Sequence, residues 1–352
     1  MTLFARDIQN GGATSASPRA IRICLAASGG GHLHEMLDLR PFWKEHDHFF
    51  VTEPTPIADS LATSERVHLV EPIAFGHFKA KPLLSVLRSS FGNIRAAWRT
   101  ITIERPDLVI STGAGSAFFV VLFAKLFGAK YVHVEAFCRF ETPTIFGRLI
   151  HHFADATFVQ SEQLANVWPN IEVFDPFVRM PSSTEAREDL GVITVGTVLP
   201  FDRLVNAVAS LSPDGGRPSR LVAQVGTGGV RPAGMDARET IEFEEMTALL
   251  ERAKVVFCHA GNGSLMSALE AGCRIVAMPR RADLGEHWDE HQQEIVRAFA
   301  ARGVIEVANG ADDVQPALER ALAKPAARAH NDHSALIQRL RAITREWFGL
   351  LA

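Results

Sequence analysis

Four clusters of glycine each follow a short apolar run, and their position suits the binding of phosphate groups. They lie at residues 28–32, 112–116, 226–229 and 261–264. At the carboxyl end of a parallel strand, glycine lets the backbone approach a ligand, and the next helix offers free N–H groups to an anion. One such turn also suits an ordinary strand–helix connection. Two in each half of the chain predict a phosphate-bearing ligand in a cleft between two domains.

Other chemistries have weaker support in the sequence. No cluster has the GxxxxGK[ST] pattern of a Walker A loop or a clean GxGxxG pattern, and no DxD motif occurs. Residues 287–291, HWDEH, fit the HxxEH pattern of inverted zinc peptidases. The residues after His291 offer no convincing further ligand. We therefore expect no metal, and expect the N–H groups of the turn at 259–264, helped by the helix dipole, to bind a diphosphate instead.

The segments between these turns predict the architecture that positions them. Short apolar runs alternate with amphipathic stretches, as in a parallel sheet covered by helices. The predicted strands of the first half are residues 21–26, 48–52, 67–70, 108–111, 130–134 and 156–159. Those of the second half are residues 192–195, 221–225, 255–258, 275–278 and 304–307. The predicted fold class is α/β, with two Rossmann-like domains and a cleft between them.

Changes in residue composition along the chain suggest where the domains begin and end. Residues 1–20 are polar and lack the apolar region of a secretory signal, so we interpret them as a mobile leader. Residues 21–180 form the first predicted domain. Residues 181–190 form a linker rich in Pro, Ser, Glu and Arg, and residues 191–330 form the second domain. Residues 331–352 have helical apolar spacing and are expected to pack back on the first domain.

Composition limits the class of protein. The chain has 352 residues, of which 47% are hydrophobic, and its formal net charge is −4. This is enough for two cores, and the lack of a dominant basic field argues against a nucleic-acid partner. The longest dense apolar run, residues 117–124, is too short to span a bilayer. Four cysteines form no CxxC pair and are expected to be reduced core residues: Cys24, Cys138, Cys258 and Cys273.

One segment has the composition of a membrane-surface helix. Residues 75–99 combine five Lys and Arg residues with aromatic and leucine residues such as Phe75, Phe78, Phe91 and Trp98. A basic amphipathic segment of this kind suits an anionic lipid surface. The alternative is a helix packed on its own sheet.

Taken in order, several of these segments resemble the two subunits of Alg14/Alg13-type glycosyltransferases. ASGGGHLHEM (27–36), PDLVISTGAGS (106–116) and VHVEAFCRF (132–140) are similar to the membrane-associated Alg14 subunit. Further segments resemble the Alg13-type donor-binding subunit and the related domain of the lipid-intermediate N-acetylglucosaminyltransferase of peptidoglycan synthesis: ITVGTVLPFD (193–202), 224–228, HAGNGSLMSALEAG (259–272) and His291-Gln292. The resemblance covers about residues 21–310. It implies a fused two-domain glycosyltransferase of the GT-B fold, most like the sphingan-type β-1,4-glucuronosyltransferases of bacterial exopolysaccharide assembly.

The resemblance places a UDP-sugar donor on the second half, with no further cofactor. The residues implied are Gly196, Thr197, Gly226, His259, Gly261, Asn262, Gly263, Ser264, His291 and Gln292. The family's ribose-binding Glu is replaced by Ser267, so Glu270, one turn further on the same helix face, is the substitute. Arg280 and Arg281 would face the hexose, where a guanidinium can hold a carboxylate by two hydrogen bonds. This favours UDP-glucuronate, with UDP-galactose or UDP-N-acetylglucosamine as alternatives; arginines directed to solvent or diphosphate remain open.

The resemblance places the acceptor on the first half. The implied acceptor is glucose on polyprenyl diphosphate at the cytoplasmic face of the inner membrane, with peripheral attachment. Its contacts would be Gly29, Gly30, Gly31, Gly113 and Gly115. An inverting transfer needs a base beside the acceptor hydroxyl, and the resemblance places His32 and Glu135 there. Apolar neighbours would raise the pKa of Glu135, which makes it the preferred base, with His32 orienting it or binding phosphate; the opposite assignment stays open.

Two other functions remain open. A UDP-sugar 2-epimerase has the same two-domain architecture but needs no lipid acceptor. A non-catalytic partner that recruits a transferase to the membrane would show no transfer by itself. Acceptor-half and donor-half motifs occur together in this one chain, which favours a complete transferase.

Overall fold

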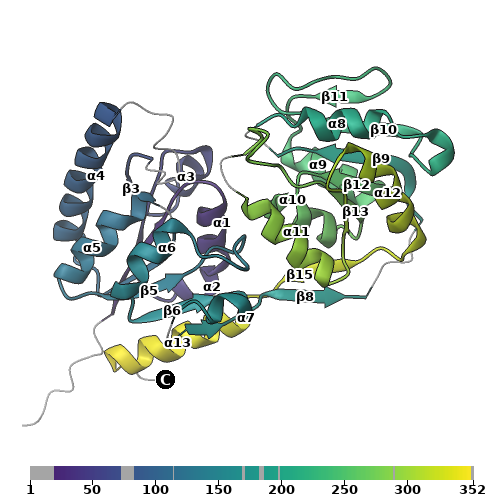
Figure 1. The fold of residues 1–352 in the computed structure, drawn as a ribbon. Helices are drawn as coiled ribbons and strands as arrows, with labels where there is room; N and C mark the ends of the chain where they lie inside the picture. The colour runs from purple at the N-terminus through teal and green to yellow at the C-terminus, as the bar shows by residue number, and fades with distance from the viewer. Residues whose placement is uncertain are drawn as a thin grey trace, which may run out of the picture.

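The computed structural model describes residues 20–72, 83–113, 115–168, 171–181, 186–196, 199–287 and 290–349, with the side chains of residues 83–89 excepted. Nearly all of the predicted leader therefore lies outside the described residues, and so does Thr197. In the predicted basic segment, residues 75–82 and the side chains of residues 83–89 also lie outside them. The described chain forms two parallel sheets side by side, each with helices on both faces (Figure 1). The predicted α/β class with two Rossmann-like domains is confirmed.

Seven parallel strands form the first sheet, in the order β3-β2-β1-β4-β5-β6-β7. The bounds are β1 Arg22–Ala27, β2 Asp47–Thr52, β3 Val67–Leu69, β4 Leu108–Gly113, β5 Lys130–Val134, β6 Ala156–Val159 and β7 Ile171–Val173. All six strands predicted for this half are present. The edge strand β7 was not predicted, because its three half-buried residues form no apolar run. The strand order reverses between β1 and β4, and a crevice at the carboxyl ends of such a pair is where open α/β sheets bind ligands.

The second sheet has six parallel strands, in the order β11-β10-β9-β12-β13-β14. The bounds are β9 Glu188–Thr194, β10 Arg220–Gln224, β11 Asp236–Arg238, β12 Ala253–Cys258, β13 Arg274–Ala277 and β14 Glu306–Val307. The strand order reverses here between β9 and β12. Gly196 and the glycine cluster at 261–264 follow these two strands, so both lie at the reversal point, whereas the cluster at 226–229 follows β10.

Helices cover both sheets, and each sheet has one apolar core on each face. The helices of the first half are α1 Gly31–Asp38, α2 Arg40–Trp43, α3 Pro56–Leu61, α4 Leu83–Glu104, α5 Phe118–Leu126, α6 Ile145–Ile150 and α7 Glu162–Ala165. Those that follow are α8 Asp202–Ala209, α9 Phe243–Arg252, α10 Asn262–Glu270, α11 His291–Ala301, α12 Val314–Ala323 and α13 Ser334–Phe348. None of the described helices has a stretch both long and apolar enough to cross a bilayer.

The chain passes between the two halves twice. Strands β8 (Phe177–Met180) and β15 (Arg328–Asn331) pair antiparallel where the two passages run side by side. After β15, helix α13 returns to the first sheet (Figure 1). There it buries four apolar side chains in the core: Leu336, Ile337, Leu340 and Ile343.

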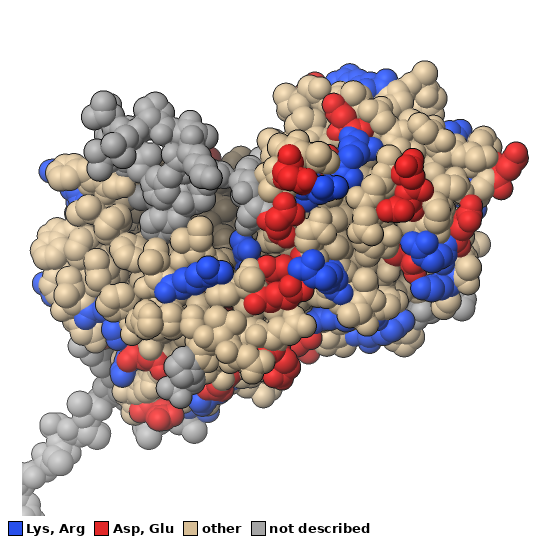
Figure 2. Space-filling model, in the orientation of Figure 1, with Lys and Arg blue, Asp and Glu red and all other residues tan. Residues whose placement is uncertain are grey.

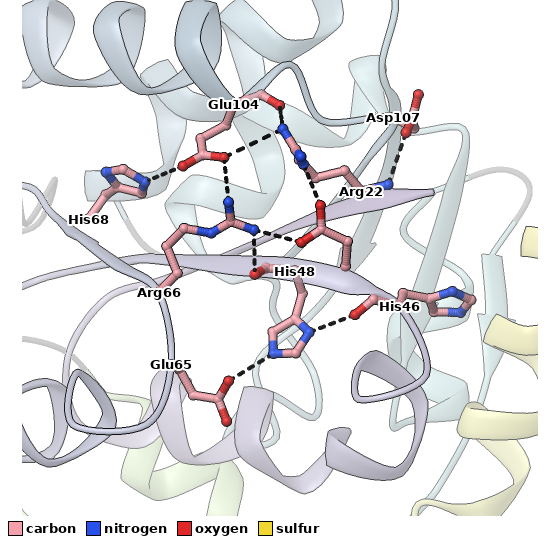
Figure 3. A network of polar contacts seen from close by, with 9 residues as sticks. Arg22, His46, His48, Glu65, Arg66, His68, Glu104 and Asp107 are labelled. Atoms are coloured by element: carbon pink, nitrogen blue, oxygen red, sulfur yellow. Dashed lines mark hydrogen bonds and ion pairs between the residues drawn. The ribbon is translucent and has the colours of Figure 1, made fainter. Parts of the chain in front are cut away.

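A network of charged side chains lies at the amino-terminal edge of the first sheet, opposite the glycine turns (Figure 3). Arg22 donates to Asp47 at 2.6 Å, and Arg66 donates to both Asp47 (2.6 Å) and Glu104 (3.1 Å). Glu104 is buried and also contacts His68 at 2.9 Å. Burial alone would raise the pKa of Asp47, but the two guanidinium groups outweigh it and hold that pKa below its usual value. The network joins the starts of β1 and β2 to the end of α4.

Candidate active site

Gly196 and the glycine turn at 261–264 border a cavity of about 310 Å³ in the second half. Gly196 borders it after β9, and the turn that links β12 to α10 borders it from the other side. The residues predicted to bind the donor that line this cavity are Gly196, His259, Gly261, Gly263, Ser264, Arg280 and Gln292. Residues far apart in the sequence thus meet at the reversal point of the sheet.

His259 explains why both turns need glycine. A Cβ on Gly261 would lie 2.3 Å from Nε2 of His259, and one on Gly196 would lie 2.9 Å from Cε1 of the same ring. Gly196 also has a φ of 78°, which disfavours any other residue. Burial, with a smaller effect from Arg280, lowers the pKa of His259 to about 3, so the ring stays neutral. Its Nδ1 lies 3.3 Å from the carbonyl oxygen of Thr194, to which it can donate.

The amino terminus of α10 points its free N–H groups toward this cavity. Gly261 precedes the helix, and no described side chain caps it. The first intrahelical bond runs from Leu265 N–H to the Gly261 carbonyl, so the N–H groups of residues 262–264 have no partner within the helix. Free N–H groups and the positive end of the helix dipole favour an anion such as a diphosphate.

In the first half, glycines lie next to His32, and two of them have free space beside their backbone. Gly30, at a φ of 78°, and Gly31 have no atom of the described residues, chain neighbours aside, within 4 Å of a Cβ built on them. Gly113, with a φ of 115°, borders the ring of His32, because its Cβ would lie 3.2 Å from Cε1. The structure therefore brings three of the predicted acceptor glycines together at the start of α1.

The other two acceptor glycines contact the protein itself. A Cβ on Gly29 would lie 2.3 Å from the Thr55 side chain, and the Gly29 N–H donates to Glu53 at 3.3 Å. Gly115 is buried in the short 3₁₀ helix η1 (Gly115–Ala117). These glycines support the turn rather than present a surface to a ligand.

His32 has a carboxylate partner that the sequence analysis missed. Nδ1 of His32 lies 3.5 Å from Oε2 of Glu35, and neither atom has a hydrogen-bond partner among the described residues. Burial alone would lower the pKa of His32, but the charge and contact of Glu35 outweigh it and raise that pKa. The signal was the HxxE spacing, which places both side chains on one face of a helix. A histidine oriented by a carboxylate is a common general base.

The first-half and second-half sites lie on the same side of the molecule. Helices α1 and α10 face each other between the two sheets (Figure 1), and the surface is hollowed between the halves (Figure 2). Asn262, at the start of α10, lines a small cavity together with Phe137 and Phe140, which follow β5. The Phe137 N–H donates to Glu35 at 3.0 Å, which connects this cavity to the His32 pair. The expected cleft therefore brings donor turn and His32 toward each other.

Solved structures of other proteins share this two-sheet architecture. MurG from Acinetobacter baumannii is similar with a TM-score of 0.61 at 16% identity, over 92% of this chain and 99% of that one. The glycotransferase of kitacinnamycin has a TM-score of 0.60 at 15% identity, over 94% and 95%. A putative UDP-N-acetylglucosamine 2-epimerase from Listeria monocytogenes has 0.61 at 14% identity, over 94% and 98%. These likenesses show the fold, which is GT-B.

Family comparisons distinguish the two halves. Residues 23–176 match the family described as oligosaccharide biosynthesis protein Alg14 like. Residues 192–346 match the glycosyltransferase family 28 C-terminal domain. The chain is a glycosyltransferase with the GT-B fold. The mouse UDP-N-acetylglucosamine transferase subunit ALG14 is 24% identical over an alignment of 182 residues, which covers 44% of this chain and 82% of that protein.

Arg280 of the glycosyltransferase has a different environment from the one expected. Its guanidinium is buried and lies over the Phe201 ring, 4.7 Å from the centroid. It donates to the backbone carbonyls of Pro200 (2.7 Å), Val195 (2.9 Å) and Leu199 (2.6 Å). Burial lowers the pKa of Arg280 to about 10, although Glu286 acts in the opposite direction. Arg280 thus fixes the segment that forms one wall of the cavity, and its donors are not available to a sugar carboxylate.

Arg281 lies outside the cavity lining. It is exposed, and its Nε donates to Asp283 at 3.0 Å. Its backbone N–H donates to Glu286 at 3.0 Å, so acidic side chains already surround it. The carboxylate of a glucuronate sugar would be repelled by the like charges of Asp283 and Glu286 at this position. The predicted arginine clamp for glucuronate does not form in this arrangement.

Glu270 is also placed differently. It is the last residue of α10, so it lies about 12 Å along the helix axis from Asn262. Its surroundings are Asp38 and His330; burial and Asp38 raise its pKa, although His330 acts the other way. Neither Glu270 nor Ser267, one turn earlier, lines the cavity. The predicted ribose role therefore does not fit this geometry.

Glu135 is held by the protein. It is 1% exposed, and its two oxygens accept from the N–H groups of Ala136 (2.9 Å) and Thr144 (3.2 Å). His133 Nε2 lies 3.6 Å away. Burial would raise the pKa of Glu135, but His133 and the two N–H groups outweigh it, so the predicted upward shift is wrong and the direction is downward. Glu135 is buried and both of its oxygens accept hydrogen bonds from its own loop, and its charge also helps to raise the pKa of His32.

The remaining predicted residues lie around the cavity. Gly226 supports its wall, because a Cβ there would lie 3.2 Å from the carbonyl oxygen of Leu199. His291 begins α11, with its ring 4.8 Å from that of His287. Among the described residues no group of three or more His, Cys, Asp or Glu side chains is arranged to hold a metal ion.

Proposed function

We propose that this glycosyltransferase transfers a sugar from a UDP donor to a hydroxyl group of a lipid-linked acceptor, with inversion at the anomeric carbon. The observation that carries the proposal is the position of the His32–Glu35 pair in the Alg14-like half, on the same side as the anion-binding start of α10 in the family 28 half. The mouse relative is a UDP-N-acetylglucosamine transferase subunit, which supports a UDP-sugar donor.

In the proposed reaction, His32 is the base. Its Nδ1 faces Glu35, which leaves Nε2 to take the proton of the acceptor hydroxyl. The hydroxyl oxygen forms a bond to the anomeric carbon while the bond to the UDP oxygen breaks, and one in-line displacement turns an α-linked donor into a β-linked product. Glu35 stabilises the imidazolium that forms, and the N–H groups at the start of α10 stabilise the charge on the departing UDP.

The identity of the donor sugar is a separate part of the proposal. Glucuronate was expected from Arg280 and Arg281, but neither guanidinium is free in the arrangement described above. UDP-glucuronate therefore enters the test beside UDP-galactose and UDP-N-acetylglucosamine. A β-1,4 linkage to polyprenyl-diphosphate-glucose, in exopolysaccharide assembly, rests on the sequence resemblance.

We further propose that the enzyme meets its acceptor at the cytoplasmic face of the inner membrane as a peripheral protein. Helices α4 and α5, which contact each other, expose large apolar side chains: Phe91 is 69% exposed and Leu126 is 70% exposed. Arg95 and Arg99 are exposed on the same helix as Phe91. Apolar side chains next to cations suit an anionic lipid surface. Helix α1, which carries His32, packs on the opposite face of the first sheet from α4 and α5, so the lipid-linked sugar would reach His32 past the edge of this sheet.

The test is sugar transfer by the purified chain. Radiolabelled UDP sugars are supplied one at a time with synthetic polyprenyl-diphosphate-glucose in anionic liposomes, and lipid products are separated. The proposal expects one donor to label the lipid and His32→Ala to abolish the labelling. Conversion of UDP-N-acetylglucosamine to its 2-epimer without acceptor would show an epimerase instead. No labelling by any donor would favour a non-catalytic partner.

A further inference from the structure

A single carboxylate from the family 28 half holds a loop of the Alg14-like half. Glu294 lies in the first turn of α11 and is buried. Its Oε2 accepts from the backbone N–H groups of Phe140 (3.3 Å), Glu141 (3.1 Å) and Thr142 (3.2 Å). Its Oε1 accepts from the Thr142 hydroxyl. All four donors lie between β5 and α6, in residues 135–144, which we call the β5–α6 loop.

The same loop is tied to the proposed base. The Phe137 N–H donates to Oε1 of Glu35 at 3.0 Å, and the other oxygen of Glu35 faces His32. The two ends of the loop are fixed by Glu135, which accepts from Ala136 and Thr144. Three carboxylates therefore define the backbone of this loop, and only the one from Glu294 crosses between the halves.

On the other side, Glu294 shares a helix with a residue of the donor cavity. Gln292 is buried two positions earlier in α11, and its Oε1 accepts from the Arg280 N–H at 2.9 Å. Arg280 in turn holds the carbonyl groups of the cavity wall near Leu199. Hydrogen bonds, together with the backbone of the β5–α6 loop and of α11, thus connect Glu35 through Glu294 to the wall of the donor cavity.

We propose that Glu294 is a positioning residue that fixes the donor-binding half at the distance and angle needed for attack by the acceptor held beside His32. The inference rests on the proposed function. Charge-assisted bonds to a carboxylate are short-range and directional, and removing that carboxylate leaves buried N–H groups without a partner. The halves would then lose their alignment while the donor cavity, which is lined by the second half alone, stays intact.

A neighbouring interdomain contact provides a matched control. Arg297, one turn further along α11, pairs with Glu141 through Nε at 2.8 Å. Both side chains are largely accessible, at 56% and 35% relative exposure, and exposed ion pairs contribute little. Arg297→Gln thus removes a charge from the same interface and the same helix without removing the buried contact.

The experiment compares Glu294→Gln, Thr142→Val and Arg297→Gln with the wild-type enzyme. Amide hydrogen exchange is measured for peptides covering residues 136–144 and 253–270, UDP binding by calorimetry, and kcat and KM by lipid labelling. We expect Glu294→Gln to speed exchange in 136–144 only, to leave the UDP affinity within roughly twofold, and to lower kcat roughly 10- to 100-fold, as misplaced reacting groups do. Thr142→Val, in the other half, should show the same pattern to a smaller extent, and Arg297→Gln should show neither change.

Other results would overturn the inference. Unchanged exchange in 136–144 would show that Glu294 does not hold the loop, and unchanged kcat with faster exchange would show that the contact does not position the reaction. An equal loss of UDP affinity and kcat would indicate local damage to the cavity. If the wild-type enzyme transfers no sugar, the proposed function fails; the exchange results then still decide whether Glu294 joins the halves.

Discussion

The carboxylate of Glu35 lies 3.5 Å from Nδ1 of His32, one turn earlier on the same helix. This pair gives the first half a histidine whose orientation and charge are controlled by a neighbouring anion. The pKa of His32 is raised because Glu35 stabilises the protonated ring more than burial destabilises it. A base must be neutral before it accepts a proton, so the pair has a definite consequence for pH dependence.

We predict that Glu35→Gln lowers kcat roughly 10- to 100-fold and moves the acidic limb of the pH–rate profile to lower pH. With the negative charge gone, the imidazole loses its proton at lower pH, but it is also less basic and less well oriented. The measurement is kcat/KM for sugar transfer between about pH 5 and 9, across the ordinary histidine range.

Asp59→Asn is the control, because it removes an exposed carboxylate from α3 in the same half. Its profile should match that of the wild-type enzyme. An acidic limb that stays in place in Glu35→Gln would exclude His32 as the titrating base.

Gly261→Ala should weaken UDP binding at least tenfold. The new methyl group would lie 2.3 Å from His259 Nε2, which must then shift beneath both glycine turns. Gly310→Ala serves as the control, since no atom of the part of the chain that the structure describes, chain neighbours aside, lies within 4 Å of its Cβ position, and its φ of −145° suits alanine. Calorimetric titration with UDP measures the affinity of both variants for the nucleotide. Equal affinities would mean that the turn above His259 does not bind the nucleotide.

The sheets could be predicted from the sequence because buried parallel strands are nearly continuous apolar runs. Each glycine cluster follows such a run, so its place at the carboxyl end of a strand follows from the order of the elements. The donor cavity was predictable for the same reason. The short edge strand β7 was not, because partly exposed residues leave no apolar signal.

The roles of single polar residues depend on contacts that the sequence does not contain. Glu135 looked like a base because its neighbours in the chain are apolar, but N–H groups from both ends of its loop stabilise its charge. The sequence predicted that the Arg280 guanidinium would be free to bind a sugar. Instead it donates to backbone carbonyl groups within residues 195–200, which are far away in the sequence. The HxxE spacing of His32 and Glu35 predicts that they share a helix face, but it does not show that the two side chains are in contact.

Glu104→Gln should destabilise the first half by about 1–3 kcal/mol, since the buried carboxylate contacts both Arg66 and His68 and a neutral amide weakens these charge-assisted contacts. The network also predicts the pH dependence of stability. The folded pKa of Asp47 is depressed, so its contribution is present above its unfolded value and is lost as the pH falls through the folded value. Urea unfolding at neutral pH checks the first expectation, with Asp236→Asn, in an exposed pair with Arg238, as the control. Equal midpoints for Glu104→Gln and wild type would contradict it.

Replacing Phe91 and Leu126 with serine should reduce sedimentation with anionic liposomes severalfold, because these side chains expose apolar surface beside Arg95 and Arg99. Arg95→Gln with Arg99→Gln should reduce it further at low salt and less at high salt, where surface charges are screened. Phe243→Ser is the matched control: Phe243 is 74% exposed but lies on α9 of the other half. If Phe243→Ser weakened binding as much as the α4 and α5 changes, the membrane would contact a different face, and the acceptor would have to enter from the family 28 side.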